Sequence, residues 1–231
     1  IPFILGLITS FSLPPYSFFF LNFITFPLLL VFFISSYKKG KWISFKIGWI
    51  FGFGYFISNL YWITNSLTFE ENFKPLIPIA LILIPLFLGG FYGVVTFFCS
   101  FFSLNKKFSS IIIFSIFFSI IEFVRGFILG GFPWNLIAFA WTDYLSILQI
   151  LSFIGTYSFN LLSLTIFLIP SIILFNYKKT TKLSFLILTT VLLISTQSIV
   201  AAGYIAIYSL NVSDPASSAR SLDSLMKSEW G

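Results

Sequence analysis

The sequence has little charge: Asp, Glu, Lys and Arg make up only 9% of its 231 residues. A soluble domain carries about 25% charged residues, because charge keeps a folded surface in water. The chain also has no histidine, which removes the commonest metal ligand and the usual general base. Its one cysteine, Cys99, cannot form a disulfide within the chain, and a thiol in an apolar run stays protonated. These absences exclude a soluble enzyme, and they give no indication of a metal site or a cofactor.

Apolar residues are abundant instead, at 58% of the chain with 34 Phe. They form runs close to the ~20 residues that a helix needs to cross ~30 Å of hydrocarbon. The runs are apolar throughout, whereas the strands of an outer-membrane barrel alternate apolar and polar residues. We therefore predict an all-α fold, a polytopic helical membrane bundle of about seven transmembrane segments. These segments are residues 1–13, 17–36, 43–67, 76–104, 108–129, 146–176 and 183–208.

The two ends of the chain differ from the rest. Residues 1–13 rise only about 20 Å as a helix, so we interpret them as a truncated first segment. After residue 208 the composition becomes polar, with six Ser from Asn211 onward and no Phe or Ile. We predict two regions: a transmembrane bundle over 1–208, and an atypical tail over 209–231 that is disordered or forms a short surface helix. The missing initiator Met and the polar tail suggest a fragment or a disrupted reading frame.

The basic residues are unevenly distributed between the connections. Nine of the 13 Lys and Arg lie around the second, fourth and sixth connections, at Lys38, Lys39, Lys41, Lys46, Lys106, Lys107, Lys178, Lys179 and Lys182. The alternate connections hold acidic residues and only one base, Lys74. The positive-inside rule places the Lys-rich loops in the cytoplasm, and the loop over 130–145 and the C-terminus in the periplasm. This topology accounts for the net charge of +6, so no nucleic-acid partner is expected.

Two ionisable residues, Glu122 and Arg125, lie inside an apolar segment and three residues apart, close enough to pair on a helix. Such residues cost ~2.5–3.5 kcal/mol each at a bilayer centre, so a functional role and a purely structural ion pair are both open readings. Gly130 and Gly131 are expected to end this helix. An ordered outer loop should follow, and the candidate site residues there are Gly131, Phe132, Pro133, Trp134 and Asn135.

The third segment supplies a second set of candidates. Gly48, Gly52 and the offset Gly54 form a small-residue face that lets a neighbouring helix approach closely. Helical spacing puts Tyr55, Asn59 and Trp62 on one polar and aromatic stripe near the outer leaflet. Packing and interfacial anchoring explain much of this pattern. Tyr55, Tyr61 and Trp62 are nevertheless kept as candidates, and the outer-side pair Tyr157 and Asn160 forms a third polar group.

At these stretches the sequence resembles the apolipoprotein N-acyltransferases of the bacterial inner membrane. The family pattern Glu-x-x-Arg-Gly-x-x-x-x-Gly-Phe-Pro-Trp matches Glu122 to Gly126 followed by Gly131 to Trp134. The Gly-rich, aromatic third helix of the family is similar to residues 52–62, and residues 12–16 and 154–157 match weaker features. The likeness covers residues 1 to about 208.

The resemblance implies an acyl-transfer function. Family members move an acyl chain from a membrane phospholipid onto a catalytic Cys, and then onto the N-terminal Cys of a diacylated lipoprotein. The resemblance places their Glu-Lys-Cys triad in a periplasmic nitrilase-like domain after the seventh helix. Only 23 residues follow position 208 here, and none of them is Cys. We therefore expect no catalytic residue in this chain, and a membrane portion that is inactive alone. The alternatives are a small polytopic transporter or channel, and a remnant without activity.

Overall fold

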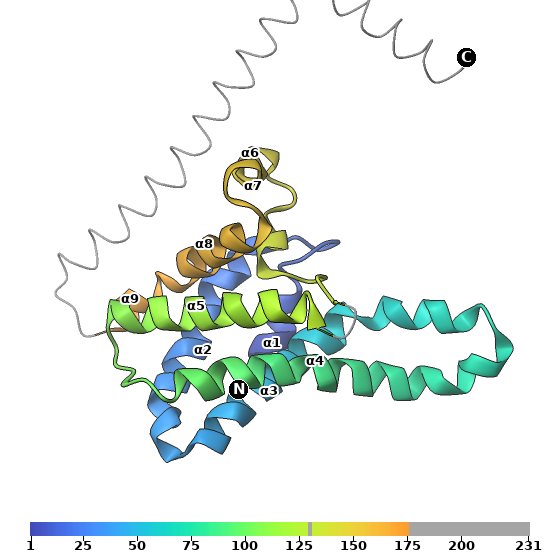
Figure 1. Ribbon diagram of the computed structural model, residues 1–231, viewed down its shortest axis with the longest axis horizontal. Coiled ribbons are helices and arrows are strands. Elements are labelled where there is room, and N and C mark those ends of the chain that lie inside the picture. Colours follow the sequence, from blue (N-terminus) through green and yellow to red (C-terminus); the bar gives the residue numbers. More distant parts are fainter. Residues whose placement is uncertain (129–130, 176–231) are drawn as a thin grey trace, which may run out of the picture. The chain divides into compact units, whose positions relative to one another are not determined.

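The computed structural model describes residues 1–128 and 131–175, and the regular structure within those ranges is entirely helical (Figure 1). The predicted all-α fold is confirmed over this part of the chain. These residues belong to one compact unit. The predicted segment over 183–208 and the predicted polar tail over 209–231 lie outside the described residues.

The described elements are α-helices and shorter 3₁₀ helices. In chain order they are α1 (Pro2–Ser10), η1 (Phe19–Leu21), α2 (Asn22–Ser36), η2 (Tyr37–Lys39), α3 (Lys41–Asn59), η3 (Tyr61–Thr68), η4 (Glu71–Leu76), α4 (Ile77–Cys99), α5 (Phe108–Arg125), η6 (Ile137–Trp141), α6 (Leu145–Leu148), α7 (Leu151–Ile154), α8 (Thr156–Leu168) and α9 (Ser171–Leu174).

Four stretches of the described chain are long and apolar enough to cross a membrane. They are Phe19–Lys39, Glu71–Cys99, Phe108–Arg125 and Thr156–Leu174. Each overlaps a segment predicted from the sequence, so a multi-pass helical membrane protein is supported. Helix α1, with nine residues, is too short to span, as expected for residues 1–13. A total of about seven spans stays a prediction.

Three predicted boundaries are wrong. The segment over 146–176 is not one helix, because Gly155 adopts a φ of +76° and separates α7 from α8. The third helix does not continue to residue 67, since α3 ends at Asn59 and 3₁₀ structure follows. Helix α5 ends at Arg125 rather than at the Gly130-Gly131 pair. Apolar composition continued through all three breaks, so hydropathy alone could not locate them.

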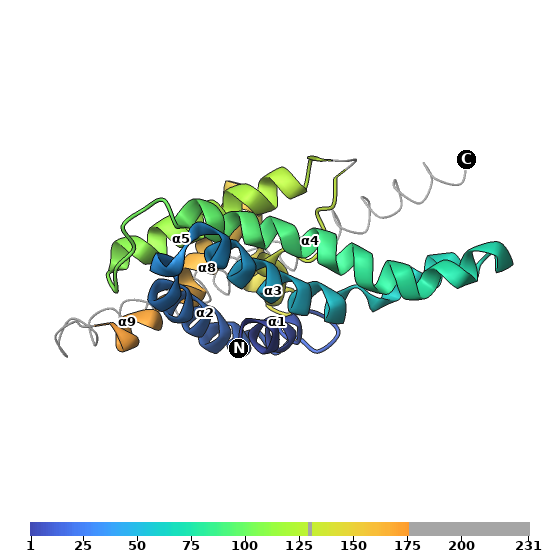
Figure 2. The same cartoon turned by 90° about the horizontal axis from the view of Figure 1, so that it is seen from below.

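Helix α3 lies between α1 and α4 and packs against both (Figure 2). Its small residues make this possible, as predicted, but they serve two neighbours rather than one. A Cβ on Gly48 would lie 2.1 Å from the Tyr92 carbonyl oxygen of α4, and one on Gly54 would lie 2.3 Å from the Phe3 oxygen of α1. Backbones this close exclude any side chain at these positions.

The two lysine-rich connections among the described residues meet at one end of the bundle. The Tyr37 hydroxyl, in the connection between α2 and α3, donates to the carbonyl oxygen of Leu104 at 2.9 Å, in the connection between α4 and α5. The Lys41 ammonium also lies 3.7 Å from the centre of the Phe101 ring. Two of the three connections predicted to be cytoplasmic are therefore neighbours in space, and the third, with Lys178, Lys179 and Lys182, lies outside the described residues.

Candidate functional site

Glu122 is fully buried between α4, α5 and α8. Its Oε1 accepts a hydrogen bond from the Tyr92 hydroxyl at 2.9 Å, and its Oε2 accepts one from the Asn160 side-chain amide. The Asn160 Oδ1 in turn accepts from the backbone N–H of Ala138 at 2.9 Å. Glu122 on α5 is thus linked to α4 and α8, and through Asn160 to η6. These hydrogen bonds satisfy a carboxylate whose burial in an apolar interior would otherwise be costly.

Arg125 lies one turn further along α5 and is also buried. Its Nη2 is 3.6 Å from the Glu122 Oε1, so the ion pair expected from the sequence is present. Its Nη1 donates to the Trp134 carbonyl oxygen at 2.9 Å. The guanidinium carbon lies 5.2 Å from the centre of the Phe56 ring and 5.9 Å from that of Phe132, within the range of cation–π contact.

The loop after α5 is fixed to the bundle through its backbone. The Phe132 N–H donates to the Arg125 carbonyl oxygen at 3.0 Å, after Gly131 takes a φ of +79°. The Tyr55 hydroxyl of α3 donates to the Asn135 carbonyl oxygen at 2.9 Å, where Asn135 has a φ of +59°. Adjacent carbonyl oxygens, of Trp134 and Asn135, are therefore held by two different helices, in agreement with the ordered loop expected here.

The remaining candidates lie at the surface. Pro133 and Trp134 are exposed, and so are Tyr61 and Trp62 on η3. The rings of Trp62 and Trp134 contact each other edge to face, with centroids 6.2 Å apart. The predicted stripe of Tyr55, Asn59 and Trp62 is wrong, because α3 ends at Asn59 and Trp62 lies beyond it.

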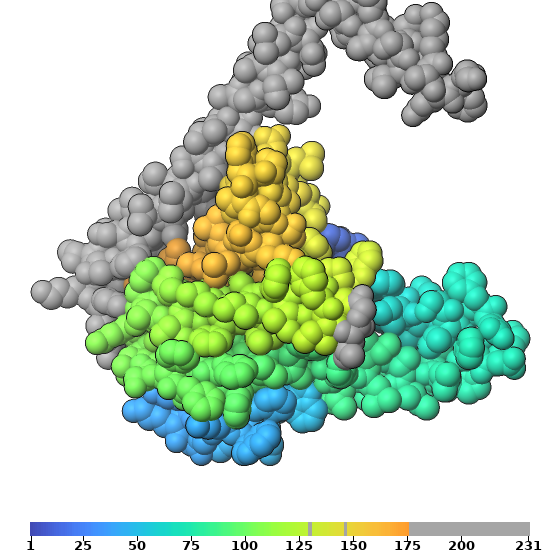
Figure 3. All heavy atoms as spheres, viewed as in Figure 1, coloured from blue at the N-terminus to red at the C-terminus, as the bar shows by residue number. Residues whose placement is uncertain are grey.

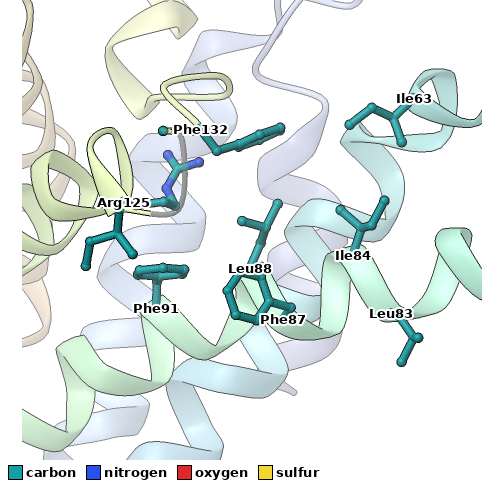
Figure 4. Close-up of a pocket in the computed structure, with 10 residues that line it drawn as sticks. Ile63, Leu83, Ile84, Phe87, Leu88, Phe91, Arg125 and Phe132 are labelled. Atoms are coloured by element: carbon teal, nitrogen blue, oxygen red, sulfur yellow. The ribbon is translucent and has the colours of Figure 1, made fainter. Parts of the chain in front are cut away.

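A pocket of about 460 Å³ opens beside this loop (Figure 4). Its lining is apolar except for Arg125, and consists of Ile63, Leu83, Ile84, Phe87, Leu88, Phe91, Arg125, Ile128, Gly131 and Phe132. A second pocket of about 480 Å³ follows the first part of α4 and η3 and shares Ile63, Leu83 and Ile84 with it. The two pockets adjoin at these three residues, and we call them together the α4–η3 groove. Three predicted residues, Arg125, Gly131 and Phe132, line it, whereas Tyr61 and Trp62 do not.

The sequence over residues 5–169 matches the model of the apolipoprotein N-acyltransferase N-terminal domain. That match covers well over half of the chain. The chain belongs to this family. Its membership agrees with the resemblance carried by Glu122, Arg125 and the Gly-Phe-Pro-Trp run.

Several curated apolipoprotein N-acyltransferases are similar to this family member. The protein of Rhizobium rhizogenes strain K84 is 30% identical over 73% of this chain and 33% of its own length. That of Sinorhizobium medicae is 32% identical over 74% of this chain and 34% of its own length. That of Brucella melitensis is 29% identical, with the same coverage as the second. The chain spans about a third of the length of the curated relatives it matches.

Sequence reasoning missed two kinds of residue in this N-acyltransferase domain. The sequence indicates Tyr92 only as part of an apolar segment, although its hydroxyl donates directly to the Glu122 carboxylate. A hydroxyl among the apolar residues of α4 was the available signal. The groove residues Phe87, Leu88 and Phe91 carried no signal, because a groove-lining residue and a lipid-facing residue look alike in an apolar helix.

Proposed function

We propose that this chain is the membrane portion of an apolipoprotein N-acyltransferase, the part that admits lipid substrates from the bilayer. The α4–η3 groove takes a membrane phospholipid as acyl donor. The acceptor is a diacylated lipoprotein, which approaches the same outer end of the bundle. Glu122 and Arg125 position the loop that borders the groove, and Trp62 and Trp134 lie at the membrane interface beside it.

The observation that carries this proposal is the groove itself. An apolar groove that begins beside Arg125 and continues along α4 and η3 suits an acyl chain, because its walls are as apolar as the bilayer that the chain leaves. The open side of the groove includes exposed α4 side chains, so a lipid can enter laterally from the bilayer.

The acyl-transfer chemistry belongs, in this proposal, to a nitrilase-like domain rather than to residues 1–175. Cys99 is the one thiol in the chain, and it is buried at the C-terminal end of α4. It follows the groove residue Phe91 by eight positions, or about 12 Å along the helix. A buried thiol at that distance cannot act as the nucleophile for a lipid held beside Arg125. We expect the purified chain alone to transfer no acyl group to a diacylated lipopeptide.

Orientation follows from the charge distribution and from the contact between the Lys-rich connections. We propose a multi-pass protein of the bacterial inner membrane, with these connections in the cytoplasm and the loop over 130–145 in the periplasm. The groove then opens toward the periplasmic leaflet.

The test is whether filling the groove displaces phospholipid. Leu83 lines both pockets and its side chain is 55% exposed, whereas its neighbour Ile82 is 54% exposed and lines neither. Leu83→Trp should lower the fraction of purified chain that carries phospholipid, measured by native mass spectrometry. Ile82→Trp is the matched control and should leave that fraction unchanged. Equal lipid retention by both variants and the unaltered chain would refute the proposal.

A further inference from the structure

Arg125 has hydrogen-bonding capacity that the described chain does not use. Of its three guanidinium nitrogens, Nη1 donates to the Trp134 carbonyl oxygen, but neither Nε nor Nη2 has an acceptor among the described residues. The 3.6 Å between Nη2 and the Glu122 Oε1 gives attraction but is too long for a hydrogen bond. The side chain is nevertheless buried. Buried guanidinium N–H groups are normally satisfied, so an acceptor is expected at this position.

The side chain that carries these donors lies beside the α4–η3 groove. Arg125 is part of the lining of the 460 Å³ pocket, and Figure 4 shows its guanidinium beside Phe132 and above Phe91. The other lining residues are apolar or glycine. A ligand that lies in the pocket therefore has apolar walls around it, with the unpaired N–H groups of one buried guanidinium beside them.

The charge around Arg125 limits the kind of acceptor. Glu122 is buried beside it and already offsets the guanidinium charge. A second anion, such as a phosphate, would lose its hydration and would be repelled by the Glu122 carboxylate. A neutral acceptor avoids both costs. The acyl-ester carbonyl is the neutral acceptor that adjoins the chains of a diacyl lipid.

We propose that Arg125 binds an acyl-ester carbonyl of a glycerophospholipid, whose chain then runs along the α4–η3 groove. This inference rests on the proposed function and specifies how the lipid is recognised. A diacyl lipid has two ester groups, so the one held by Arg125 leaves the other for transfer. The lipid is thus recognised below its headgroup, by the linkage between chain and glycerol.

The experiment compares two phosphatidylethanolamines with the same headgroup and chain length, one with ester-linked chains and one with ether-linked chains. The purified chain is offered both in competition, and bound lipid is measured by native mass spectrometry. We expect the ester lipid to bind about tenfold more tightly, because a hydrogen bond to a charged donor is lost in the ether. Equal binding of the two lipids would overturn the assignment.

Two further lipids separate the sources of the acceptor. Phosphatidylglycerol carries a net negative headgroup, and we expect its ester form to show the same tenfold preference over its ether form. If ether-linked phosphatidylglycerol still bound more tightly than ether-linked phosphatidylethanolamine, Arg125 would bind the headgroup phosphate rather than the ester. That result would contradict the proposal. A diacylated lipopeptide that displaces the phospholipid at equal concentration would also contradict it, by making the acceptor the occupant.

Two variants distinguish failure of this inference from failure of the proposed function. Arg125→Lys keeps a charge beside Glu122 but loses the planar fork, so the preference for ester over ether should approach one. Leu83→Trp should weaken both lipids equally and leave that preference intact. If the chain retains neither lipid, the proposed function fails. If it retains both lipids equally, only the role of Arg125 fails. This comparison uses the unaltered chain, so it remains valid even if a variant does not fold.

Discussion

At the scale of single residues, the centre of the domain is a polar network inside an apolar bundle. Glu122 is the member that all the others contact: Tyr92, Arg125 and Asn160 lie around it, from three helices. The sequence predicted the pairing of Glu122 with Arg125, because a spacing of three residues is visible along one helix. It could not predict Tyr92 or Asn160 as partners, since these lie 30 and 38 residues away in the chain.

The Tyr92 hydroxyl is open to a direct test. Tyr92→Phe keeps the ring that packs against Phe118 but removes the donor to Glu122. We expect the free energy of unfolding in mixed micelles to fall by ~1–3 kcal/mol, because a buried carboxylate loses a partner. Tyr61→Phe makes the same deletion on a side chain that is 58% exposed and should change stability by less than ~0.5 kcal/mol. Equal effects of the two changes would argue against the network.

Asn160 should matter more than Tyr92. Asn160→Ala removes both the donor to Glu122 and the acceptor for the Ala138 N–H. Because two buried groups then lack a partner, the loss of unfolding free energy should be roughly twice that of Tyr92→Phe. The exposed Asn65 provides the control, and Asn65→Ala should be close to neutral. If Asn160→Ala lowered the free energy of unfolding no more than the control, the Asn160 amide would not stabilise the network.

At the scale of elements, glycine decides how closely the helices approach. Gly48 and Gly52 lie against α4, and Gly54 lies against α1. The sequence predicted a close approach but assigned it to one neighbour, because a helical face is visible in a sequence and its partner is not. The broken helix over 146–176 was missed for a related reason. Gly155 gave no sign of its positive φ within a run of apolar residues.

A pair of Gly→Ala changes tests this packing. Gly48→Ala would put a methyl group 2.1 Å from the Tyr92 oxygen, so α3 and α4 must separate, at a cost of about 1–3 kcal/mol in unfolding free energy. Gly90→Ala is the matched change in α4, where an added methyl group meets nothing within 4 Å. It should be neutral or slightly stabilising, because Ala is the better helix former. Thermal unfolding of both variants, followed by circular dichroism, gives the comparison.

At the scale of the whole molecule, the described connections sort into two groups. Tyr37 and Leu104 join the Lys-rich connections at one end, while Tyr55 and Asn135 join the third helix to the outer loop. In the space-filling view, one side of α5 is exposed at the surface of the bundle (Figure 3). The positive-inside rule predicts which end of the bundle lies in the cytoplasm, because it assigns whole loops, and that assignment stays a prediction.

Site-directed labelling in intact cells tests the orientation. In a Cys99→Ser background, a cysteine at the exposed Phe69 should react with a maleimide that cannot cross the inner membrane. A cysteine at the exposed Lys38 should react only after that membrane is permeabilised. The opposite pattern would invert the proposed topology. Because both positions are exposed in the described chain, a difference in reactivity reports on the side of the membrane rather than on burial.

The two hydrogen bonds that fix the loop after α5 to the bundle are accepted by its backbone rather than by its side chains. Arg125 and Tyr55 hold the carbonyl oxygens of Trp134 and Asn135, and every amino acid supplies such an oxygen. Neither hydrogen bond uses the side chain at position 134, which is exposed and contacts the Trp62 ring. Replacing Trp134 with another exposed residue therefore leaves both of these hydrogen bonds available, because each is accepted by the backbone.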